Sequence, residues 1–159
     1  MCGRFELKTK FDDLPTILKK NYPRGLNYKY ETQNLIRPND PVLVIKNEGK
    51  IQTTFMSWGF ISPWTKNPFE LGRPRPFNAR SETIEDKKLF SSSWKHKRCL
   101  IPASGFFEKT FRVRKKNYKT FWLGGIWSKW SSSDGAELES CCILTTEPND
   151  LIKPIHHRM

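Results

Sequence analysis

The second residue of the chain carries two nucleophiles once the initiator methionine is removed. The chain begins Met1-Cys2-Gly3, and loss of Met1, which is common before a small residue, leaves Cys2 with both a thiol and an α-amine. An α-amine has a pKa near ~8, so a useful fraction is neutral at neutral pH. It can condense with an aldehyde to an imine, and the thiolate can then close a five-membered thiazolidine ring. Position alone, however, favours an ordinary second residue.

Three further side chains could support such chemistry. Glu108 could act as a general acid and base, although a glutamate in this context is more often a solvent-facing strand residue. Histidine titrates near neutral pH, so His156 could transfer protons, with His157 as its neighbouring competitor. Asn78 offers a hydrogen-bond donor and acceptors, or is simply a turn residue after a Pro-rich stretch.

The net charge indicates a polyanionic partner. The 159 residues include 28 Lys and Arg against 16 Asp and Glu, a net charge of +12, and nucleic acid is the commonest partner of so basic a domain. No apolar run could span a bilayer, and no apolar signal segment begins the chain, so we expect an intracellular protein without a membrane. The basic runs 95–98 and 112–116 could extend a nucleic-acid surface or be solvated faces.

The four cysteines indicate reduced thiols rather than disulfides or a metal site. Cys141 and Cys142 are adjacent, so on a strand they point to opposite faces and cannot easily pair with each other. The spacing of Cys and His gives little support to zinc. We expect neither a metal nor a cofactor.

The pattern of the chain predicts one α+β domain over residues 1–159. A helix is expected at 11–20 and another at 81–90, and a β-hairpin at 42–58. Prolines predict a surface loop over 62–76. Strands are expected at 98–101, 106–113, 120–123 and 141–144, followed by a helical turn near the end. The predicted architecture is a mostly antiparallel curved sheet or partly open β-barrel with a few short helices.

Five ordered blocks resemble the SOS-response-associated peptidase (SRAP) family and run through nearly the whole chain. They are Met1-Cys2-Gly3-Arg4-Phe5, Trp58-Gly59-Phe60-Ile61 with Pro63-Trp64, Asn78-Ala79-Arg80-Ser81-Glu82-Thr83, Arg98 to Ala103 leading to Gly105-Phe106-Phe107-Glu108, and Ile155-His156-His157-Arg158-Met159. The resemblance implies that mature Cys2 crosslinks to the ring-opened aldehyde of an abasic site in single-stranded DNA. It also implies that Asn78, Glu108 and His156 surround this reaction.

The same blocks suggest how DNA would be held. Arg4, Arg80 and Arg158 could hold phosphates beside the lesion. Trp64 could stack on an unpaired base, or could instead anchor its loop in the core. We expect a monomer. Two other functions remain open: an N-terminal-cysteine peptidase or autopeptidase, and a non-catalytic reader of single-stranded or modified DNA.

Three departures from the family pattern are visible. The chain ends inside the final block, so we expect a domain that lacks the usual C-terminal portion, with a loosely held His156. Lys109 replaces the aromatic residue common after the glutamate, and Leu35-Ile36-Arg37-Pro38 matches the family's Asn-x-x-Pro loop poorly.

Overall fold

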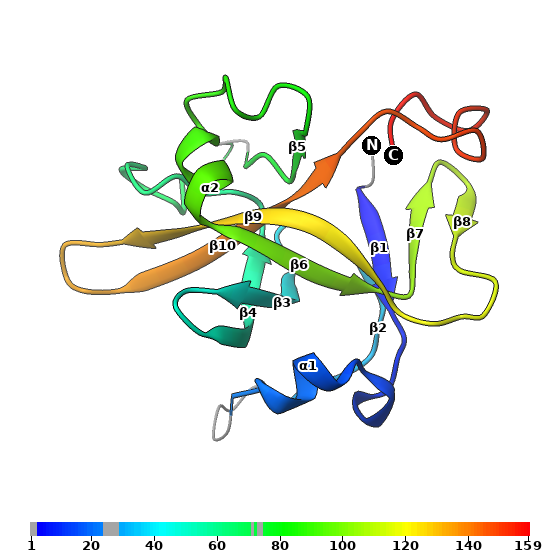
Figure 1. The fold of residues 1–159 in the computed structure, drawn as a ribbon. Helices are drawn as coiled ribbons and strands as arrows, with labels where there is room; N and C mark the ends of the chain where they lie inside the picture. Colours follow the sequence, from blue (N-terminus) through cyan, green and yellow to red (C-terminus); the bar gives the residue numbers. More distant parts are fainter. Residues whose placement is uncertain (1–2, 24–28, 71, 73–74) are drawn as a thin grey trace.

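The computed structural model describes residues 3–23, 29–70, 72 and 75–159, and strands dominate it (Figure 1). The helical segments are a 3-10 turn at Phe11–Asp13 and two short helices, α1 (Thr16–Lys20) and α2 (Ser91–His96). The strands are β1 (Arg4–Leu7), β2 (Gln33–Ile36), β3 (Pro41–Asn47), β4 (Ile51–Trp58), β5 (Asn78–Arg80), β6 (Arg98–Ala103), β7 (Gly105–Glu108), β8 (Phe111–Val113), β9 (Phe121–Ser131) and β10 (Glu137–Thr145). This architecture confirms the predicted class.

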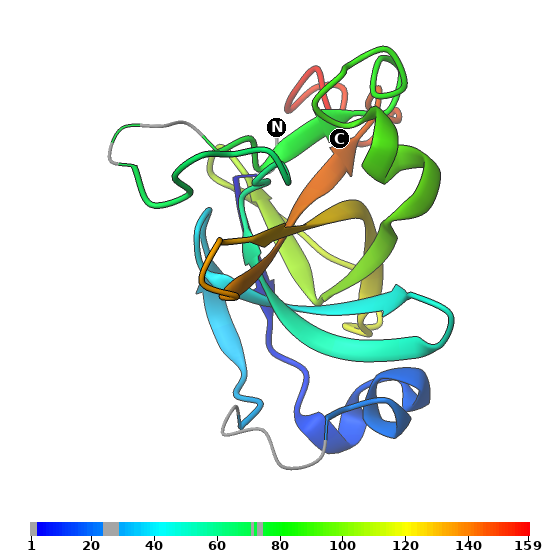
Figure 2. The same ribbon diagram turned by 90° about the vertical axis from the view of Figure 1, so that its left-hand side faces the viewer.

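Five strands form a barrel. They follow the order β4-β3-β6-β9-β10 with antiparallel pairing, and β10 then returns to β4 through a short parallel contact at Ser140↔Ser57 and Cys141↔Trp58. In Figure 2 the β3–β4 hairpin curves around the interior from the side opposite β9 and β10. β5 adds to the far end of β10 in parallel. The barrel is therefore closed by only two residue pairs, in agreement with the predicted partly open barrel.

A second, antiparallel sheet carries the amino-terminal strand. Its order is β2-β1-β7-β8, and β1 pairs with β7 at Arg4↔Phe107, Phe5↔Phe106 and Glu6↔Gly105. Extending this register by one residue places Gly3 opposite Glu108. In Figure 1 the start of β1 and the last residues of the chain lie close together, beside β7.

The hydrophobic core lies on both faces of β10. Cys141 packs into the larger cluster with Phe5, Trp58 and Trp127, whereas Cys142 packs into a smaller cluster with Phe60 and Phe90. The adjacent cysteines therefore do point to opposite faces, as their spacing predicts. Cys99, Cys141 and Cys142 are unbridged and buried.

Two predicted helices differ in the structure. Phe11–Asp13 and α1 are separate because Leu14 precedes Pro15, whose ring disfavours the helical conformation of the residue before it. Leu14 is accordingly extended, with φ −64° and ψ 150°. The helix predicted at 81–90 is wrong: this segment forms successive turns, and α2 begins at Ser91. Ile84 and Phe90, six residues apart, are both buried in the smaller cluster, a spacing that does not match one face of a helix.

The strand predicted at 106–113 is two strands in the structure. The chain reverses at Lys109, which has a φ of 54°, and β8 returns antiparallel to β7 with Glu108↔Phe111 as the pair nearest the turn. The hairpin at 42–58 and the strands predicted at 98–101 and 141–144 are confirmed, and the strand predicted at 120–123 is the start of β9, which begins at Phe121. Within the described ranges, no helix has the length and apolarity needed to cross a membrane.

Candidate active site

The site is built around the amino-terminal end of β1. Gly3 precedes this strand, lies opposite the end of β7 by register, and a Cβ built on it would be 3.7 Å from the ring of Phe77. Three segments distant in sequence therefore meet at Gly3: the chain start, β7 and the start of β5. Cys2, which precedes Gly3 in the chain, lies outside the described residues.

Glu108 is the last residue of β7 and is only 6% exposed. Its neighbours on the strand pair with β1, and the tight turn at Lys109 follows immediately. A carboxyl in this position is fixed by two neighbouring strands rather than carried on a mobile loop. The alternative of a solvent-facing strand position therefore does not describe Glu108.

His156 faces Glu108 from the last segment of the chain. Its Nε2 lies 3.6 Å from Oε1 of Glu108, which is longer than a hydrogen bond but within ion-pair range when the imidazole is charged. The backbone N–H of Arg158 donates to Nδ1 at 3.0 Å, which in the neutral ring places the proton on Nε2, toward Glu108. The backbone of Arg158 thus holds the ring with Nε2 directed at Glu108.

The segment that carries His156 is anchored by Arg158. The guanidinium donates to both carboxylate oxygens of Glu82, at 3.0 and 2.7 Å, and to the carbonyl oxygen of Thr145 at 2.8 Å. These hydrogen bonds from Arg158 lower the pKa of Glu82 to about 2. Thr146 and Met159 exchange two backbone hydrogen bonds, at 2.8 and 2.9 Å. The expected looseness of His156 is therefore not observed.

Arg158 is engaged within the protein. The sequence predicts a phosphate contact here, as for Arg4 and Arg80, whereas in the structure its side chain is 9% exposed and its guanidinium donates to Glu82 and Thr145. Both partners leave little of the group available to a ligand. Arg158 is better placed to position His156 than to bind DNA.

Asn78 begins β5 beside this cluster. β5 is held by β10 through the pair Ile143↔Asn78, and the carbonyl oxygen of the preceding Phe77 accepts from Trp58 Nε1 at 2.8 Å and from the Ile143 backbone at 2.9 Å. Trp58 also packs edge-to-face with both Phe77 and Phe5. One buried indole thus fixes β1 and β5 relative to each other, and with them Gly3 and Asn78.

His157 lies next to the site rather than in it. Its ring stacks on His156 with 4.2 Å between centroids, but its side chain is exposed. The charge of His156 lowers the pKa of His157 below its ordinary value, and desolvation and the nearby Arg80 and Arg158 act in the same direction. The geometry therefore favours His156 over His157 as the partner of Glu108.

Two predicted phosphate contacts lie at the edges of this region. Arg4, the first residue of β1, donates to the Lys109 carbonyl oxygen at 2.7 Å and lies over the Phe107 ring. Arg80 ends β5 and is exposed. Both are cations near the Glu108–His156 pair, on different strands.

The structure does not bring Trp64 to this cluster. Its side chain is 57% exposed, in the Pro-rich loop, and it lines a hollow with Phe69, Trp130 and residues 131–133 at the tip of the β9–β10 hairpin. In Figure 1 this hairpin tip lies at the left, far from β7 and from the last residues of the chain. Trp64 is therefore an exposed aromatic and not a core anchor, but it is remote from Glu108.

The cysteines of the core are poor nucleophiles. Burial raises the pKa of Cys99 to about 12 and also raises the pKa values of Cys141 and Cys142 well above the ordinary value of a thiol. Within the part of the chain that the structure describes, no group of three or more His, Cys, Asp and Glu side chains gathers in a way that could hold a metal ion.

Sequence reasoning missed Glu82 and Trp58 as positioning residues. Both lie inside the blocks that carry the family resemblance, so a signal was present. Their partners, Arg158 and Phe77, are 76 and 19 residues away, and the sequence alone does not reveal such contacts.

Comparisons with known proteins agree with this arrangement. The family model described as SOS response associated peptidase (SRAP) matches residues 1–159. Abasic site processing protein YoaM of Bacillus subtilis (strain 168) is 37% identical, with 100% of this chain and 73% of that protein covered. Abasic site processing protein YedK of Escherichia coli (strain K12) is 24% identical, with 99% and 73% covered.

A crystal structure of a protein from Bacteroides thetaiotaomicron has the same fold. It superposes with a TM-score of 0.78 at 22% identity, over 99% of this chain and 75% of that one. Fold, family model and relatives agree over essentially the whole length of the chain. The chain belongs to the SRAP family.

Proposed function

We propose that the protein processes abasic sites in single-stranded DNA by forming a covalent bond through Cys2 after removal of Met1. Abasic-site processing is what its relatives in Bacillus and Escherichia are named for. The observation that carries the proposal is the Glu108–His156 pair beside Gly3, the residue that follows Cys2. The site brings proton-transfer groups to the start of the chain, where the α-amine and thiol would be.

The proposed reaction joins one aldehyde, one amine and one thiol with loss of one water. The α-amine of Cys2 attacks C1′ of the ring-opened sugar, and the resulting carbinolamine expels its hydroxyl as water to give an imine. The thiol then adds its sulfur to the imine carbon, and its proton passes to the nitrogen. The product is a thiazolidine, and neither an oxidant nor a cofactor is required.

We assign proton transfer to Glu108 and His156. Opening of the sugar ring needs a proton on the ring oxygen and removal of one from the hydroxyl at C1′, and dehydration of the carbinolamine needs a proton on the leaving hydroxyl. A buried carboxyl and an imidazole that face each other at 3.6 Å can serve as proton donor and acceptor. Asn78 would orient the sugar or the amine through its amide.

The remaining residues would position these groups and the DNA strand. Arg158 and Glu82 hold the segment of His156, and Arg4 and Arg80 would bind phosphates next to the lesion. Trp64 would contact bases only if the strand continues toward the β9–β10 hairpin. We further propose a monomer that acts inside the cell on DNA, which suits the unbridged buried thiols.

Denaturing gels with an abasic single-stranded oligonucleotide test the proposal. Wild-type protein is expected to give a band that survives denaturation. Cys2→Ala and Cys2→Ser keep an amine but lose the thiol, so they should give a stable band only after reduction of the imine with borohydride. Cys99→Ala, a matched change at a buried cysteine, should crosslink as wild type does. Stable crosslinking by Cys2→Ala without reduction would overturn the proposal.

Two other activities would give different results with the same protein and the same oligonucleotide. A peptidase with Cys2 as its nucleophile would cleave peptide bonds and would need no abasic site. A non-catalytic reader would bind DNA reversibly, with strong salt dependence and no covalent band. Peptide turnover, or binding without any adduct by protein that has lost Met1, would favour one of these over the proposed chemistry.

A further inference from the structure

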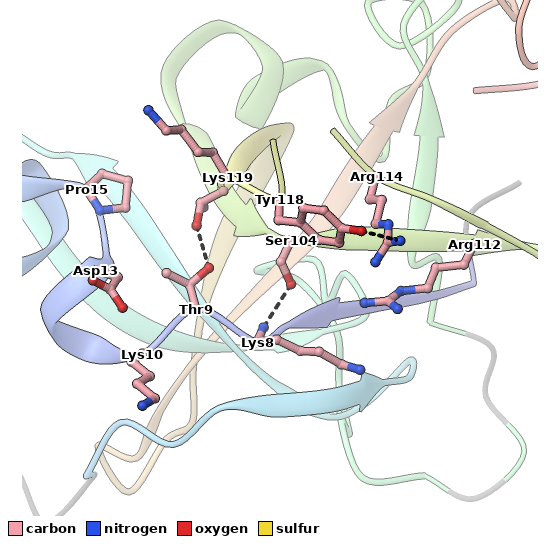
Figure 3. A pocket seen from close by; sticks show the side chains of 11 residues that line it. Lys8, Thr9, Lys10, Asp13, Pro15, Ser104, Arg112, Arg114, Tyr118 and Lys119 are labelled. Atoms are coloured by element: carbon pink, nitrogen blue, oxygen red, sulfur yellow. Dashed lines mark hydrogen bonds between the residues drawn. The ribbon is translucent and has the colours of Figure 1, made fainter. Parts of the chain in front are cut away.

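A basic pocket lies at the opposite end of β1 from the candidate active site. It has a volume of about 760 Å³. Figure 3 shows that its side chains come from three segments: the chain just after β1, the residue that follows β6, and β8 with its connection to β9. Its cations are Lys8, Lys10, Arg112, Arg114 and Lys119, and Asp13 is the one carboxylate among the residues that line it.

The wall of the pocket is organised by Glu6. This residue is 1% exposed, and its Oε1 accepts from Arg112 Nε at 2.8 Å while Oε2 lies 3.5 Å from Lys8 Nζ. Gly105, opposite Glu6, makes room for the carboxylate, because a Cβ there would lie 2.7 Å from Oε1. A buried carboxylate thus fixes two of the five cations at the protein surface.

The other three cations lie at the surface of the pocket. In the part of the chain that the structure describes, no carboxylate forms an ion pair with Lys10, Arg114 or Lys119, and all three are exposed. Hydroxyl groups lie between them: Ser104 accepts from the Lys8 backbone at 2.8 Å, and Thr9 and Thr120 share a hydrogen bond at 2.6 Å. Three cations around hydroxyl groups can bind the oxygens of a phosphate.

Tyr118 adds an exposed aromatic face at the rim. Its side chain is 64% exposed, and Arg114 both lies 4.0 Å from the ring centroid and donates to its hydroxyl at 2.9 Å. Its φ of 58° is unusual for a bulky residue and carries a conformational cost. An aromatic ring interleaved with cations is the arrangement that binds bases and backbone of a single strand.

We propose that this pocket binds backbone phosphates of a nucleic-acid strand, as a second DNA contact separate from the candidate active site. β1 rises about 3.4 Å per residue, so Lys8 lies roughly 17 Å from Gly3 along the strand. At about 3.4 Å per stacked nucleotide, that distance corresponds to roughly five nucleotides. The contact does not depend on crosslinking and would also act on undamaged DNA.

Binding of an undamaged single strand of about 20 nucleotides, measured by fluorescence polarisation from about 50 to 200 mM salt, tests the pocket. The test variant is Lys10→Ala/Arg114→Ala/Lys119→Ala. The matched control, Lys50→Ala/Lys87→Ala/Lys88→Ala, removes the same number of positive charges from exposed positions outside the pocket. Thermal unfolding of both variants shows that they remain folded.

We expect the pocket variant to lose at least about tenfold in affinity and to reduce the salt slope by about two, because each single-strand contact contributes about 0.7. The control should change the slope much less. Tyr118→Ala should weaken binding about tenfold with an unchanged slope, since stacking involves no counterion release. A nucleoside triphosphate should bind the pocket much more weakly than the DNA strand does, and such weak competition would support a site for a strand.

Several results would overturn the proposal. Equal losses in the pocket and control variants would show that net charge alone drives binding, and unchanged binding in the pocket variant would show that no strand enters it. A triphosphate that binds more tightly than the strand would assign the pocket to a free nucleotide instead.

Discussion

The two ends of β1 hold polar groups in opposite ways. At the amino-terminal end Glu108 is buried, and His156 accepts a hydrogen bond from the backbone N–H of Arg158, which is itself anchored by its ion pair with Glu82. At the other end Lys10, Arg114 and Lys119 are exposed around the basic pocket and carry long, mobile side chains. One end has few groups in fixed places, and the other has several groups of one charge.

This difference separates what chemistry requires from what affinity requires. Proton transfer depends on the placement of individual atoms, so the loss of one group has a large effect. Phosphate binding depends on the number of neutralised charges, so losses are smaller and add up. Substitutions at the two ends are therefore expected to differ in size, in salt dependence and in the step that they change.

The largest effect is expected from Glu108→Gln. The amide preserves the shape of the side chain but cannot transfer a proton, so the single-turnover rate of crosslinking should fall by about a hundredfold or more. Affinity for undamaged DNA and its salt slope should stay close to the wild-type values. A crosslinking rate within about twofold of wild type would remove Glu108 from the proposed chemistry.

The paired variants His156→Gln and His157→Gln sharpen the assignment of the histidine. Only His156 faces Glu108, so its loss should slow crosslinking about tenfold or more, and loss of His157 should change it little. The charge of His156 holds the pKa of His157 down, so in His156→Gln the pKa of His157 should rise toward its ordinary value. Proton NMR titration measures this shift. A slower crosslinking rate in His157→Gln than in His156→Gln would assign proton transfer to His157.

Gly105→Ala tests the link between the two ends, because Glu6 lies opposite Gly105. The new Cβ would lie 2.7 Å from Glu6 Oε1 and 3.2 Å from the Val113 carbonyl oxygen, so the carboxylate must move and loosen Arg112. We expect a loss of about 1–3 kcal/mol in the free energy of unfolding. Gly124→Ala is the control, since its Cβ would meet only Leu144, at an ordinary 3.7 Å. Equal stability of the two variants in urea would contradict this role for Gly105.

The smallest effect is expected from Glu82→Gln and depends on pH. The folded-state pKa of Glu82 is about 2, below its ordinary value of 4.5. A lowered pKa stabilises the fold above the unfolded value, and the stabilisation is lost as pH falls toward the folded value. The melting temperature of wild type should exceed that of Glu82→Gln by a constant margin above about pH 5, and the margin should shrink between about pH 4.5 and 2. A margin that grows on acidification would contradict the ion pair.

Local patterns predicted much of the barrel. The hairpin at 42–58 and the opposite faces of Cys141 and Cys142 follow from alternation along a strand, which is a local property. The helix expected at 81–90 failed because Ile84 and Phe90 are fixed by long-range packing in the smaller core cluster. β1 and β5 were missed because four and three residues give too short a pattern to recognise.

The same contrast between local patterns and long-range contacts applies to the candidate site. The types of Glu108 and His156 suggested their chemistry, but their proximity depends on a contact between residues 48 positions apart and on the fold of the last segment. Arg158 has the same side chain as Arg4 and Arg80, and only the structure shows that Glu82 occupies it. The sequence indicated the run 112–116 as a segment that could extend a nucleic-acid surface, but only the structure shows that Lys10 and Lys119 join Arg114 in one pocket.

Intact mass spectrometry before and after incubation with an abasic single-stranded oligonucleotide tests the central claim most directly. We predict that the protein has lost Met1, and that incubation adds the mass of the oligonucleotide minus one water, with the adduct mapped to Cys2. An adduct on Cys99, Cys141 or Cys142, a stable adduct that persists in Cys2→Ala, or no adduct on protein that has lost Met1 would contradict it.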